Sequence, residues 1–405
     1  MVKVAILGYG TVGSGVYDVI KENNEIVSRN SGDKVEVKYV LDLRKFPGDE
    51  VENILVDDYQ TIVNDKEVNV ICETMGGINP AYEFTKQALA KGISVCTSNK
   101  ELVAGHGPEL IALAAQNNCN YRFEASVGGG IPIIRALNDC LTGEKIDAIS
   151  GILNGTTNFI LTKMSREGAD FAEVLKEAQD KGYAEKNPEA DVEGHDACRK
   201  IAILSSLMYG ENVDYKQIYT EGITKITAMD FQYVKSMNSS IKIMGISKNE
   251  DGKAYAMVAP FIINNEHPLY NVNDVFNGIF VHSNMLDNSM YYGRGAGKLP
   301  TASAVVADVV DCAKNLGKAL PYEWSANEKK LNSIDSYESA FFVRVNGNLE
   351  DKLAAVKGAF GNVTTLKLDG NDSEFAFTTN KMTEVSFAEK IKEVDGVITR
   401  IRMEI

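Results

Sequence analysis

The chain has 405 residues, of which 44% are hydrophobic and 24% are charged, as in an ordinary globular protein with two or three domains. Its formal net charge of −14 argues against nucleic-acid binding, which needs a basic face, so an anionic ligand would require a local basic pocket. No apolar stretch approaches the roughly 18 residues that cross a bilayer, and the start shows no charged leader, so we expect a cytoplasmic protein without a membrane partner.

The six cysteines are scattered along the chain, and no two of them form a C-x-x-C pair. Most of them stand in apolar surroundings, so buried free thiols are the simplest interpretation, and such thiols suit a reducing cytoplasm. The spacing indicates neither a disulfide framework nor a zinc site.

The first 130 residues alternate short apolar runs with amphipathic stretches. Runs typical of buried strands occupy residues 2–7, 35–41, 68–72, 93–97 and 120–127, and helical stretches occupy residues 12–27, 82–91 and 108–117. This alternation predicts an α/β domain over residues 1–130, a doubly wound parallel sheet of the Rossmann type.

The pattern changes after three consecutive glycines at 128–130. Strand-like runs follow at 146–153, 255–263 and 278–282, and helical segments at 159–166, 171–181 and 195–209. The mixture predicts an α+β domain over residues 131–299, which we expect to bind substrate and to form a dimer contact. A helix at 302–316 is expected to fold back on the first domain, which residues 300–330 would complete.

Residues 338–405 form a third pattern. Strand-like runs at 340–345, 363–368, 374–379 and 397–403 alternate with helical segments at 351–360 and 385–391. The resulting order β-α-β-β-α-β predicts a ferredoxin-like unit at the end of the chain.

A glycine motif lies seven residues into the chain, between the first predicted strand and the first predicted helix. The residues Gly8-Tyr9-Gly10-Thr11-Val12-Gly13 match G-x-G-x-x-G, whose glycines permit a tight turn, close approach to a pyrophosphate and close helix packing. Phosphates would lie at the helix N-terminus, where unpaired N–H groups and the helix dipole favour anions. We therefore predict a dinucleotide site here.

Charged residues follow the second predicted strand. Asp42 ends that strand, where an acid would hold the ribose hydroxyls of NAD. Arg44 and Lys45 come directly afterwards and could instead pair with the 2′-phosphate of NADP. The sequence leaves the choice between NAD and NADP open.

Lys100 comes shortly after the strand at 93–97, in the stretch Thr97-Ser98-Asn99-Lys100. Ligands of parallel α/β sheets bind at the carboxyl ends of the strands, so Lys100 could reach a phosphate, the nicotinamide region or a substrate. An ordinary solvated loop lysine is the equally weighted alternative.

Asp196 and Lys200 stand four residues apart on the predicted helix 195–209, hence on one face. A solvated ion pair is the simpler interpretation. However, residues 201–210 contain no charged side chain, so this helix is apolar over most of its circumference and should be buried. A lysine at the floor of a pocket can be tuned toward proton transfer.

At these residues the sequence resembles the homoserine dehydrogenase family. Residues 182–200 contain the elements Asn-Pro-x-x-Asp and Gly-x-Asp-x-x-x-Lys. The other matching stretches are Asn154-Gly155-Thr156-Thr157-Asn158-Phe159, Gly295-Ala296-Gly297-Lys298-Leu299-Pro300-Thr301-Ala302-Ser303, residues 97–101 and Glu124-Ala125-Ser126-Val127-Gly128-Gly129-Gly130-Ile131-Pro132. They stand in the right order and cover the chain from residue 4 to about residue 316.

The resemblance implies reduction of aspartate 4-semialdehyde to homoserine with NAD(P)H. It implies that Lys200 is the acid/base and that Asp196, beside it, contacts the substrate. It also implies that Glu185 binds the ammonium group of the substrate. Among the remaining implied contacts are Asp191 in the polar substrate network, Gly182 at the nicotinamide side, Lys100 and Gly295 at the cofactor, and Thr74 near the nicotinamide. It also implies a monovalent cation such as Na⁺, held by Glu124 and the carbonyls of Val127, Gly129 and Ile131, where a plain backbone turn is the alternative.

Residues 338–405 resemble an ACT domain, which the family often carries and for which threonine is the expected effector. The match is loose, because Glu350-Asp351 replaces the usual Pro-Gly pair at the start of the first helix of this segment. Without that glycine, close backbone approach to a ligand is disfavoured, so an intermolecular sheet in a homodimer or homotetramer is an equally weighted role.

Two other functions remain open at this point. A dinucleotide-binding amino-acid sensor without catalysis would use the same first and last domains but leaves Lys200, Glu185 and Asp196 unexplained. Another NAD(P) oxidoreductase could act on a different small carbonyl or hydroxy acid. Glu185 favours an amino-acid substrate, because a carboxylate is the natural partner of an ammonium group.

Overall fold

The computed structural model describes residues 1–404, so the last residue of the predicted tail lies outside the described residues. The chain forms two compact units. The first comprises residues 1–144, 202–215 and 293–329, and the second comprises residues 145–201, 216–292 and the chain from 330 onward. Within residues 1–404, no helix combines the length and the apolar character needed to cross a bilayer.

The first unit is built on a six-stranded parallel sheet with the order β3-β2-β1-β4-β5-β6. The predicted Rossmann-type sheet is confirmed. Its strand order reverses between β1 and β4, and a sheet of this kind binds ligands at that point, beyond the carboxyl ends of its strands. The strands are β1 (Val2–Leu7), β2 (Val35–Leu41), β3 (Leu55–Val56), β4 (Val68–Glu73), β5 (Ser94–Thr97) and β6 (Tyr121–Arg122).

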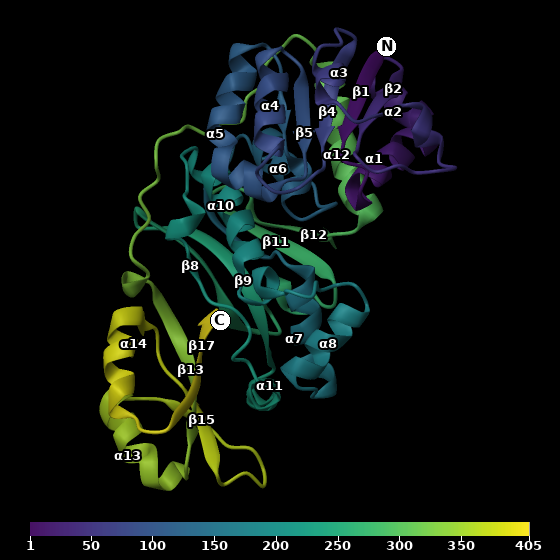
Figure 1. Cartoon of the computed structure of the whole chain (residues 1–405). Helices are drawn as coiled ribbons and strands as arrows, with labels where there is room; N and C mark the ends of the chain where they lie inside the picture. Colours follow the sequence, from purple (N-terminus) through teal and green to yellow (C-terminus); the bar gives the residue numbers. More distant parts are fainter. Residues whose placement is uncertain (405) are drawn as a thin grey trace. The chain divides into compact units, whose positions relative to one another are not determined.

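Helices cover both faces of this sheet (Figure 1). Helices α4 and α5 lie on one face, and α1, α2 and α12 pack together on the other, so α12 folds back on the first domain as predicted. The helices are α1 (Thr11–Glu22), α2 (Asn24–Ser31), α3 (Tyr59–Val63), α4 (Ala81–Ala90), α5 (Lys100–Gln116), α6 (Ile133–Arg135) and α12 (Lys298–Lys314), with short helical turns η1 (Glu50–Asn53), η2 (Glu124–Ser126) and η3 (Ala136–Cys140).

Three predicted elements of this unit were wrong in extent. The stretch 12–27 forms two helices, because the chain leaves helical geometry at Asn23. The helix predicted at 108–117 starts at Lys100, because the Asn99 side chain caps it by accepting the Leu102 N–H, and Pro108 lies inside it. Lys100 is therefore a first-turn helix residue rather than a loop residue. The strand predicted at 120–127 ends at Arg122 and gives way to η2.

The second unit is built on a mixed sheet with the order β12-β11-β7-β9-β10-β17-β13-β15-β14. The strands β7 (Ile146–Ile152), β10 (Lys253–Asn264) and β11 (Phe276–Ser283) match predicted strands, whereas β9 (Ser239–Glu250) and β12 (Asp287–Arg294) were missed. The short β8 (Tyr219–Thr220) pairs with β10. Strand β9 pairs with β10 along its whole length, and its residues Met244 and Ile246 belong to the hydrophobic core. Pairing and core packing therefore determine this strand more strongly than its own sequence, which contains many polar residues.

Helices pack against this sheet. The predicted helices at 159–166, 171–181 and 195–209 are confirmed as α7 (Gly155–Glu167), α8 (Phe171–Asp180) and α10 (His195–Tyr209). Additional helical elements are α9 (Glu189–Val192), α11 (Ala228–Ser236) and the turns η4 (Tyr215–Gln217), η5 (Pro268–Asn271), η6 (Ile334–Ser336) and η7 (Ile391–Glu393). A Thr227–Asp230 capping box starts α11.

The predicted β-α-β-β-α-β order of the tail is confirmed. It consists of β13 (Glu338–Asn346), α13 (Leu349–Phe360), β14 (Thr364–Leu366), β15 (Glu374–Thr378), α14 (Glu384–Lys390) and β17 (Val397–Glu404), with a short extra strand β16 (Met382–Thr383). Its four main strands are antiparallel in the order β17-β13-β15-β14, the ferredoxin-like arrangement.

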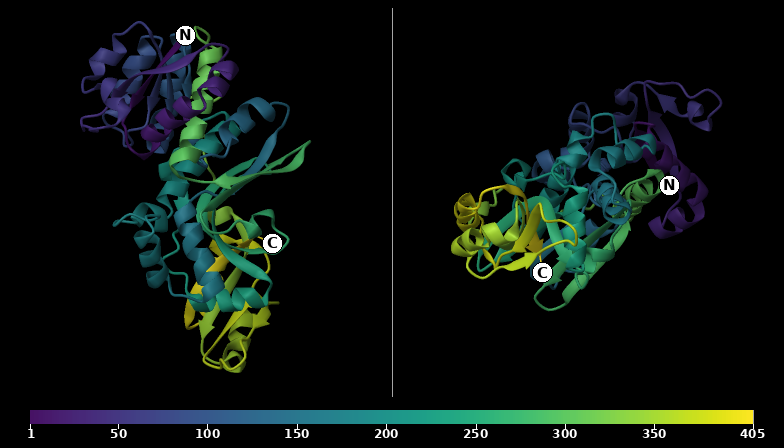
Figure 2. Two further views of the ribbon diagram at one scale, coloured as in Figure 1. Left: turned by 90° about the vertical axis from the view of Figure 1, so that its right-hand side faces the viewer. Right: turned by 90° about the horizontal axis from the view of Figure 1, so that it is seen from below.

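This C-terminal sheet is continuous with the sheet that precedes it. Strand β17 pairs in parallel with β10, and the yellow strands accordingly continue the teal and green ones in Figure 2. Two ion pairs tie the segments together: the partly buried pair of Arg402 with Glu221 at 2.7 Å and the buried pair of Arg344 with Asp230 at 2.7 Å. Breaking such buried pairs is costly, so residues 338–404 are anchored to this unit rather than loosely attached.

Candidate active site

The predicted glycine motif forms the turn between β1 and α1 in the first unit. Gly8 has φ +90, a left-handed conformation that favours glycine. A Cβ at Gly13 would lie 1.8 Å from the Gly8 carbonyl oxygen, so α1 approaches β1 as closely as only glycine allows. A Cβ at Gly10 would meet nothing within 4 Å. The turn therefore leaves open space beside Gly10 at the start of α1, as a phosphate site requires.

Thr74, at the carboxyl end of β4, supports the glycine turn. Its hydroxyl lies 2.9 Å from both the Leu7 and the Gly8 carbonyl oxygens. Next to it, the Glu73 carboxylate accepts hydrogen bonds from the Thr97 hydroxyl at 2.7 Å and the Met75 N–H at 2.8 Å, and burial raises the pKa of Glu73. Sequence reasoning missed Glu73, because a polar residue at the end of a buried strand carries no motif.

Asp42 and Arg44, at the carboxyl end of β2, form an ion pair. The two oxygens of Asp42 accept Arg44 Nε at 2.9 Å and Nη2 at 2.7 Å, and the carboxylate also accepts the Tyr9 N–H at 2.8 Å. These hydrogen bonds, chiefly those from Arg44, hold the pKa of Asp42 well below its ordinary value. The pair lies beside the glycine turn, as predicted, and the Arg44 side chain remains 62% exposed.

A cleft of about 430 Å³ connects these residues. It is lined by Gly8, Gly10, Asp42, Arg44 and Thr74, and also by residues that the sequence did not single out, among them Asp57, Tyr59 and Phe84. Tyr59 and Phe84 stack with ring centroids 4.0 Å apart. The cleft brings together the predicted dinucleotide residues from the ends of β1, β2 and β4, and it is large enough for part of a nucleotide.

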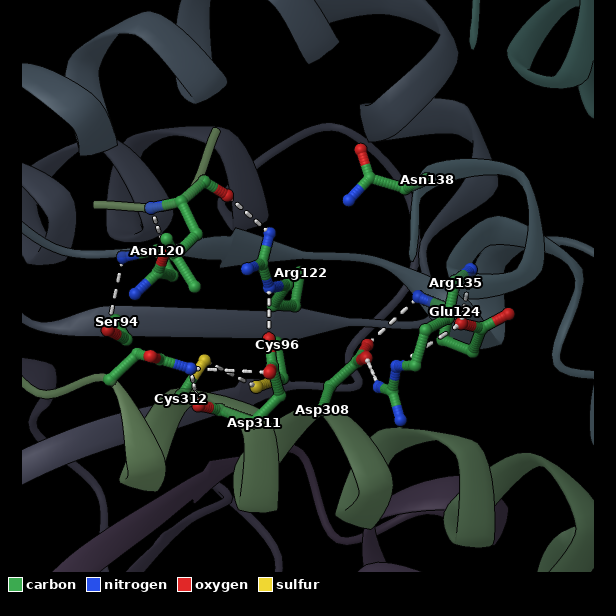
Figure 3. Close-up of polar contacts among 12 residues, drawn as sticks. Ser94, Cys96, Asn120, Arg122, Glu124, Arg135, Asn138, Asp308, Asp311 and Cys312 are labelled. Carbon is green, nitrogen blue, oxygen red and sulfur yellow. Dashed lines mark hydrogen bonds and ion pairs between the residues drawn. The ribbon is translucent and has the colours of Figure 1, made fainter. Parts of the chain in front are cut away.

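Glu124 stands in a buried charge cluster shown in Figure 3. Its carboxylate accepts the backbone N–H groups of Ile134 at 2.9 Å and Arg135 at 2.8 Å, and its own N–H donates to Asp308 of α12 at 2.9 Å. Asp308 also binds the Arg135 guanidinium at 2.8 Å. Burial raises the pKa values of both Glu124 and Asp308.

The glycine turn that follows Glu124 packs against a second glycine. Gly129 has φ +56, and a Cβ there would lie 2.6 Å from the Gly295 carbonyl oxygen. The Ile131 carbonyl already accepts the Ile133 N–H at 2.9 Å. Both oxygens of Glu124 thus bind backbone N–H groups of α6, and the further lone pairs of this carboxylate and the carbonyl groups of the turn remain the expected cation ligands. Within residues 1–404 there is no cluster of three or more histidine, cysteine or acidic side chains suited to a metal.

Lys200 and Asp196 form a buried ion pair in the second unit. Both lie on α10, with Lys200 8% and Asp196 6% exposed, and the Lys200 Nζ lies 2.6 Å from Asp196 Oδ2. The Leu153 carbonyl at the end of β7 accepts a second hydrogen bond from Nζ at 2.8 Å. Residues 201–206 are all buried, which confirms the predicted burial of this helix and excludes the solvated ion pair.

Asp191 is joined to this pair through Asn154. The Asn154 Nδ2 atom donates to Asp191 Oδ1 at 2.7 Å and to Asp196 Oδ2 at 2.9 Å. Gly182 has φ +72 in the turn after α8, and the exposed Glu185 follows, with its backbone carbonyl bound by Gln179 at 3.1 Å. The structure thus brings Lys200, Asp196 and Asp191 into one network, and it places Glu185 and Gly182 on the loop between α8 and α9.

Apart from the Glu124–Ile131 turn and the loop of Gly182 and Glu185, the predicted site residues include two groups of different chemistry, each within one unit. The first is a glycine turn with a nucleotide-sized cleft, and the second is a buried amine held by carboxylates. A dinucleotide-binding fold together with a buried amine held beside carboxylates is typical of an NAD(P)-dependent oxidoreductase.

Comparisons with known proteins identify the family. Residues 8–124 match the family model described as homoserine dehydrogenase, NAD binding domain, and residues 132–310 match the model described as homoserine dehydrogenase. The homoserine dehydrogenase of Bacillus subtilis is 36% identical over 98% of this chain and 95% of its own. The chain belongs to the homoserine dehydrogenase family.

Solved structures agree. A homoserine dehydrogenase from Thiobacillus denitrificans matches with a TM-score of 0.90 at 33% identity, covering 100% of this chain and 98% of its own. A hyperthermophilic archaeal homoserine dehydrogenase in complex with NADPH matches with a TM-score of 0.65 at 30% identity, covering 78% of this chain and 99% of its own.

Proposed function

We propose that the protein interconverts L-aspartate 4-semialdehyde and L-homoserine with NAD(P)H. The buried Lys200–Asp196 pair is the main support for this proposal. A buried lysine beside a carboxylate in a homoserine dehydrogenase is placed to exchange a proton with substrate, whereas a solvent-exposed surface lysine is not.

The site residues have distinct roles in this proposal. Lys200 donates a proton to the oxygen of the aldehyde during reduction and accepts it back during oxidation. Asp196 orients the Lys200 amine through their 2.6 Å contact and binds the substrate, and Asp191 completes the polar network through Asn154. Glu185 is exposed on its loop and offers a carboxylate to the substrate's ammonium group, and Gly182 lines the nicotinamide side.

The cofactor supplies the hydride, and the first unit binds it. We propose that Gly8, Gly10, Thr11, Val12 and Gly13 hold the pyrophosphate, with Thr74 bracing that turn and Lys100 and Gly295 contacting the cofactor. We propose a preference for NADP over NAD. Asp42 is engaged by Arg44 and Tyr9, while the Arg44 side chain is 62% exposed and lines the cleft, so its guanidinium can pair with a 2′-phosphate.

Homoserine oxidation tests this function directly. Formation of the reduced cofactor, followed by its absorbance, should require L-homoserine and should proceed with a higher kcat/KM for NADP than for NAD. Oxidation of other small hydroxy acids in preference to homoserine would favour the alternative oxidoreductase. Binding of cofactor and amino acid without turnover would favour the sensor without catalysis.

We further propose that the turn from Glu124 to Ile131 binds a monovalent cation through the carbonyls of Val127, Gly129 and Ile131. The carbonyl oxygens of a turn suit a hard cation. The Glu124 carboxylate completes the ligand set, because the two backbone N–H groups that it accepts leave further lone pairs on its oxygens.

Residues 338–404 are proposed to be an ACT-type domain with two competing roles, threonine sensing and assembly of a homodimer or homotetramer in the cytoplasm. In the continuous sheet, β17 pairs with β10, β10 with β9, and β9 with β7, which ends next to Leu153. An effector bound to residues 338–404 could act on the Lys200 site through these paired strands.

Threonine titration separates these two roles. If residues 338–404 sense threonine, millimolar threonine should lower the rate of homoserine oxidation or make it cooperative. A rate that does not respond to threonine leaves the structural role alone.

A further inference from the structure

Asn154 occupies the junction between β7 and α7, and it is 5% exposed. Its side-chain oxygen caps α7 by accepting the Thr157 N–H at 2.9 Å and the Thr157 hydroxyl at 3.0 Å. A side-chain amide has one acceptor oxygen and one nitrogen with two hydrogens. Because the cap fixes the oxygen, both hydrogens must point away from α7.

Those two hydrogens are donated to two different carboxylates. Asn154 Nδ2 lies 2.7 Å from Asp191 Oδ1 and 2.9 Å from Asp196 Oδ2. Two carboxylates that approach the same point repel each other, and a neutral amide between them offsets this repulsion with two charge-assisted hydrogen bonds. Asn154 therefore holds Asp191 and Asp196 side by side at a fixed separation.

The same oxygen of Asp196 also binds Lys200. Asp196 Oδ2 accepts Nζ at 2.6 Å, and the carbonyl of Leu153, the residue before Asn154, accepts Nζ at 2.8 Å. Leu153 thus holds the Lys200 amine directly through its carbonyl. The next residue, Asn154, holds the amine indirectly, because it binds the Asp196 carboxylate that contacts Lys200. An ammonium group has three hydrogens, and these two hydrogen bonds direct the third.

We propose that Asn154 is a positioning residue of the reaction, which clamps Asp191 and Asp196 together so that Lys200 presents its remaining hydrogen to the reacting oxygen. This inference rests on the proposed role of Lys200. Asn154 itself does not exchange a proton. It links the helix start to the acid/base geometry, so that a single side chain serves both the fold and the chemistry.

Asn154→Ser separates the two roles. Serine is as good a helix N-cap as asparagine, so α7 should persist, but serine cannot donate to both carboxylates. We expect kcat to fall roughly 10- to 100-fold, the loss typical of hydrogen bonds to charged groups, with a smaller rise in the KM for homoserine. The Tm and the Kd for NADPH should stay close to those of the wild type.

Asn154→Asp provides a second variant. Aspartate also caps helices well, but it replaces the two donors by a carboxylate facing Asp191 and Asp196. We expect kcat to fall at least as far as in Asn154→Ser. The matched control is Asn348→Ser, the same substitution at the N-cap of α13, where the side chain binds only the Glu350 N–H at 2.8 Å. It should leave kcat and KM unchanged.

The outcomes distinguish this inference from the proposed function. Wild-type kcat and KM in Asn154→Ser and Asn154→Asp, in an enzyme that Lys200→Met inactivates, would overturn the positioning role alone. Loss of activity that only matches a loss of folded, NADPH-binding protein, with kcat per folded enzyme unchanged, would show that Asn154 acts on stability alone, which also overturns it. If Lys200→Met keeps its turnover, it is the proposed function of Lys200 that fails.

Discussion

Replacing Lys200 with methionine is expected to lower kcat for homoserine oxidation by at least about 100-fold, because a positioned proton donor contributes about that much or more. Methionine keeps the length and apolar character of the side chain within the buried helix but cannot exchange a proton. The Kd for NADPH, measured by fluorescence titration, should barely change, because every residue proposed to hold the cofactor phosphates lies in the other unit.

Lys242 on β9 supplies the control. It is a second buried lysine of the same unit, 1% exposed, and burial lowers its pKa to about 7. Its Nζ, however, is bound to the Val272 carbonyl at 2.6 Å and to the Asn273 side chain at 3.0 Å, away from any carboxylate pair. The kcat of Lys242→Met, measured per folded enzyme, should therefore equal that of the wild type. Near-normal turnover in Lys200→Met, or a selective loss of kcat in Lys242→Met, would assign the proton transfer elsewhere.

Alanine at Gly13 is expected to produce the second large effect, a joint loss of stability and cofactor binding. The added Cβ would lie 1.8 Å from the Gly8 carbonyl oxygen and 2.8 Å from the Thr74 hydroxyl, so α1 must move away from β1. Overpacking of this kind costs roughly 1–3 kcal/mol, and the displaced amides of α1 would no longer face a phosphate. We expect a lower Tm and a Kd for NADPH raised at least about tenfold, which corresponds to about 1.4 kcal/mol.

Gly10→Ala is the comparison for this prediction. A Cβ at Gly10 meets nothing within 4 Å, so the Tm should stay unchanged while NADPH binds more weakly, since the methyl group enters the space left for the pyrophosphate. Equal effects of the two substitutions on Tm, or unchanged NADPH affinity in both, would contradict the proposed location of the cofactor.

Local signals made the first unit and helix α10 predictable. A buried strand, three spaced glycines and an amphipathic helix follow one another within the first 22 residues, so the turn could be placed from sequence alone. Helix α10 was predicted with its observed bounds, His195–Tyr209, because its long run without charge leaves burial as the only stable solution.

Interactions between distant segments account for what was missed. Asn154 binds Asp191 and Asp196, which lie 37 and 42 residues further along the chain, and no local pattern reports such contacts. The start of α5 was hidden because two glycines and Pro108 resemble a break, whereas the Asn99 cap and the packing of α4 on α5 override them. The continuous sheet through β10 and β17 depends on pairing between residues far apart in the chain, such as Phe261 and Arg402.

The most direct test of the account is a crystal structure of the protein with bound NADP and homoserine. We expect the Lys200 Nζ to lie within hydrogen-bond distance of the hydroxyl oxygen of homoserine, with the nicotinamide facing the carbon that bears this oxygen. An amine well beyond that reach, with no water bridging it to the oxygen, would contradict the mechanism and leave only the fold and the family.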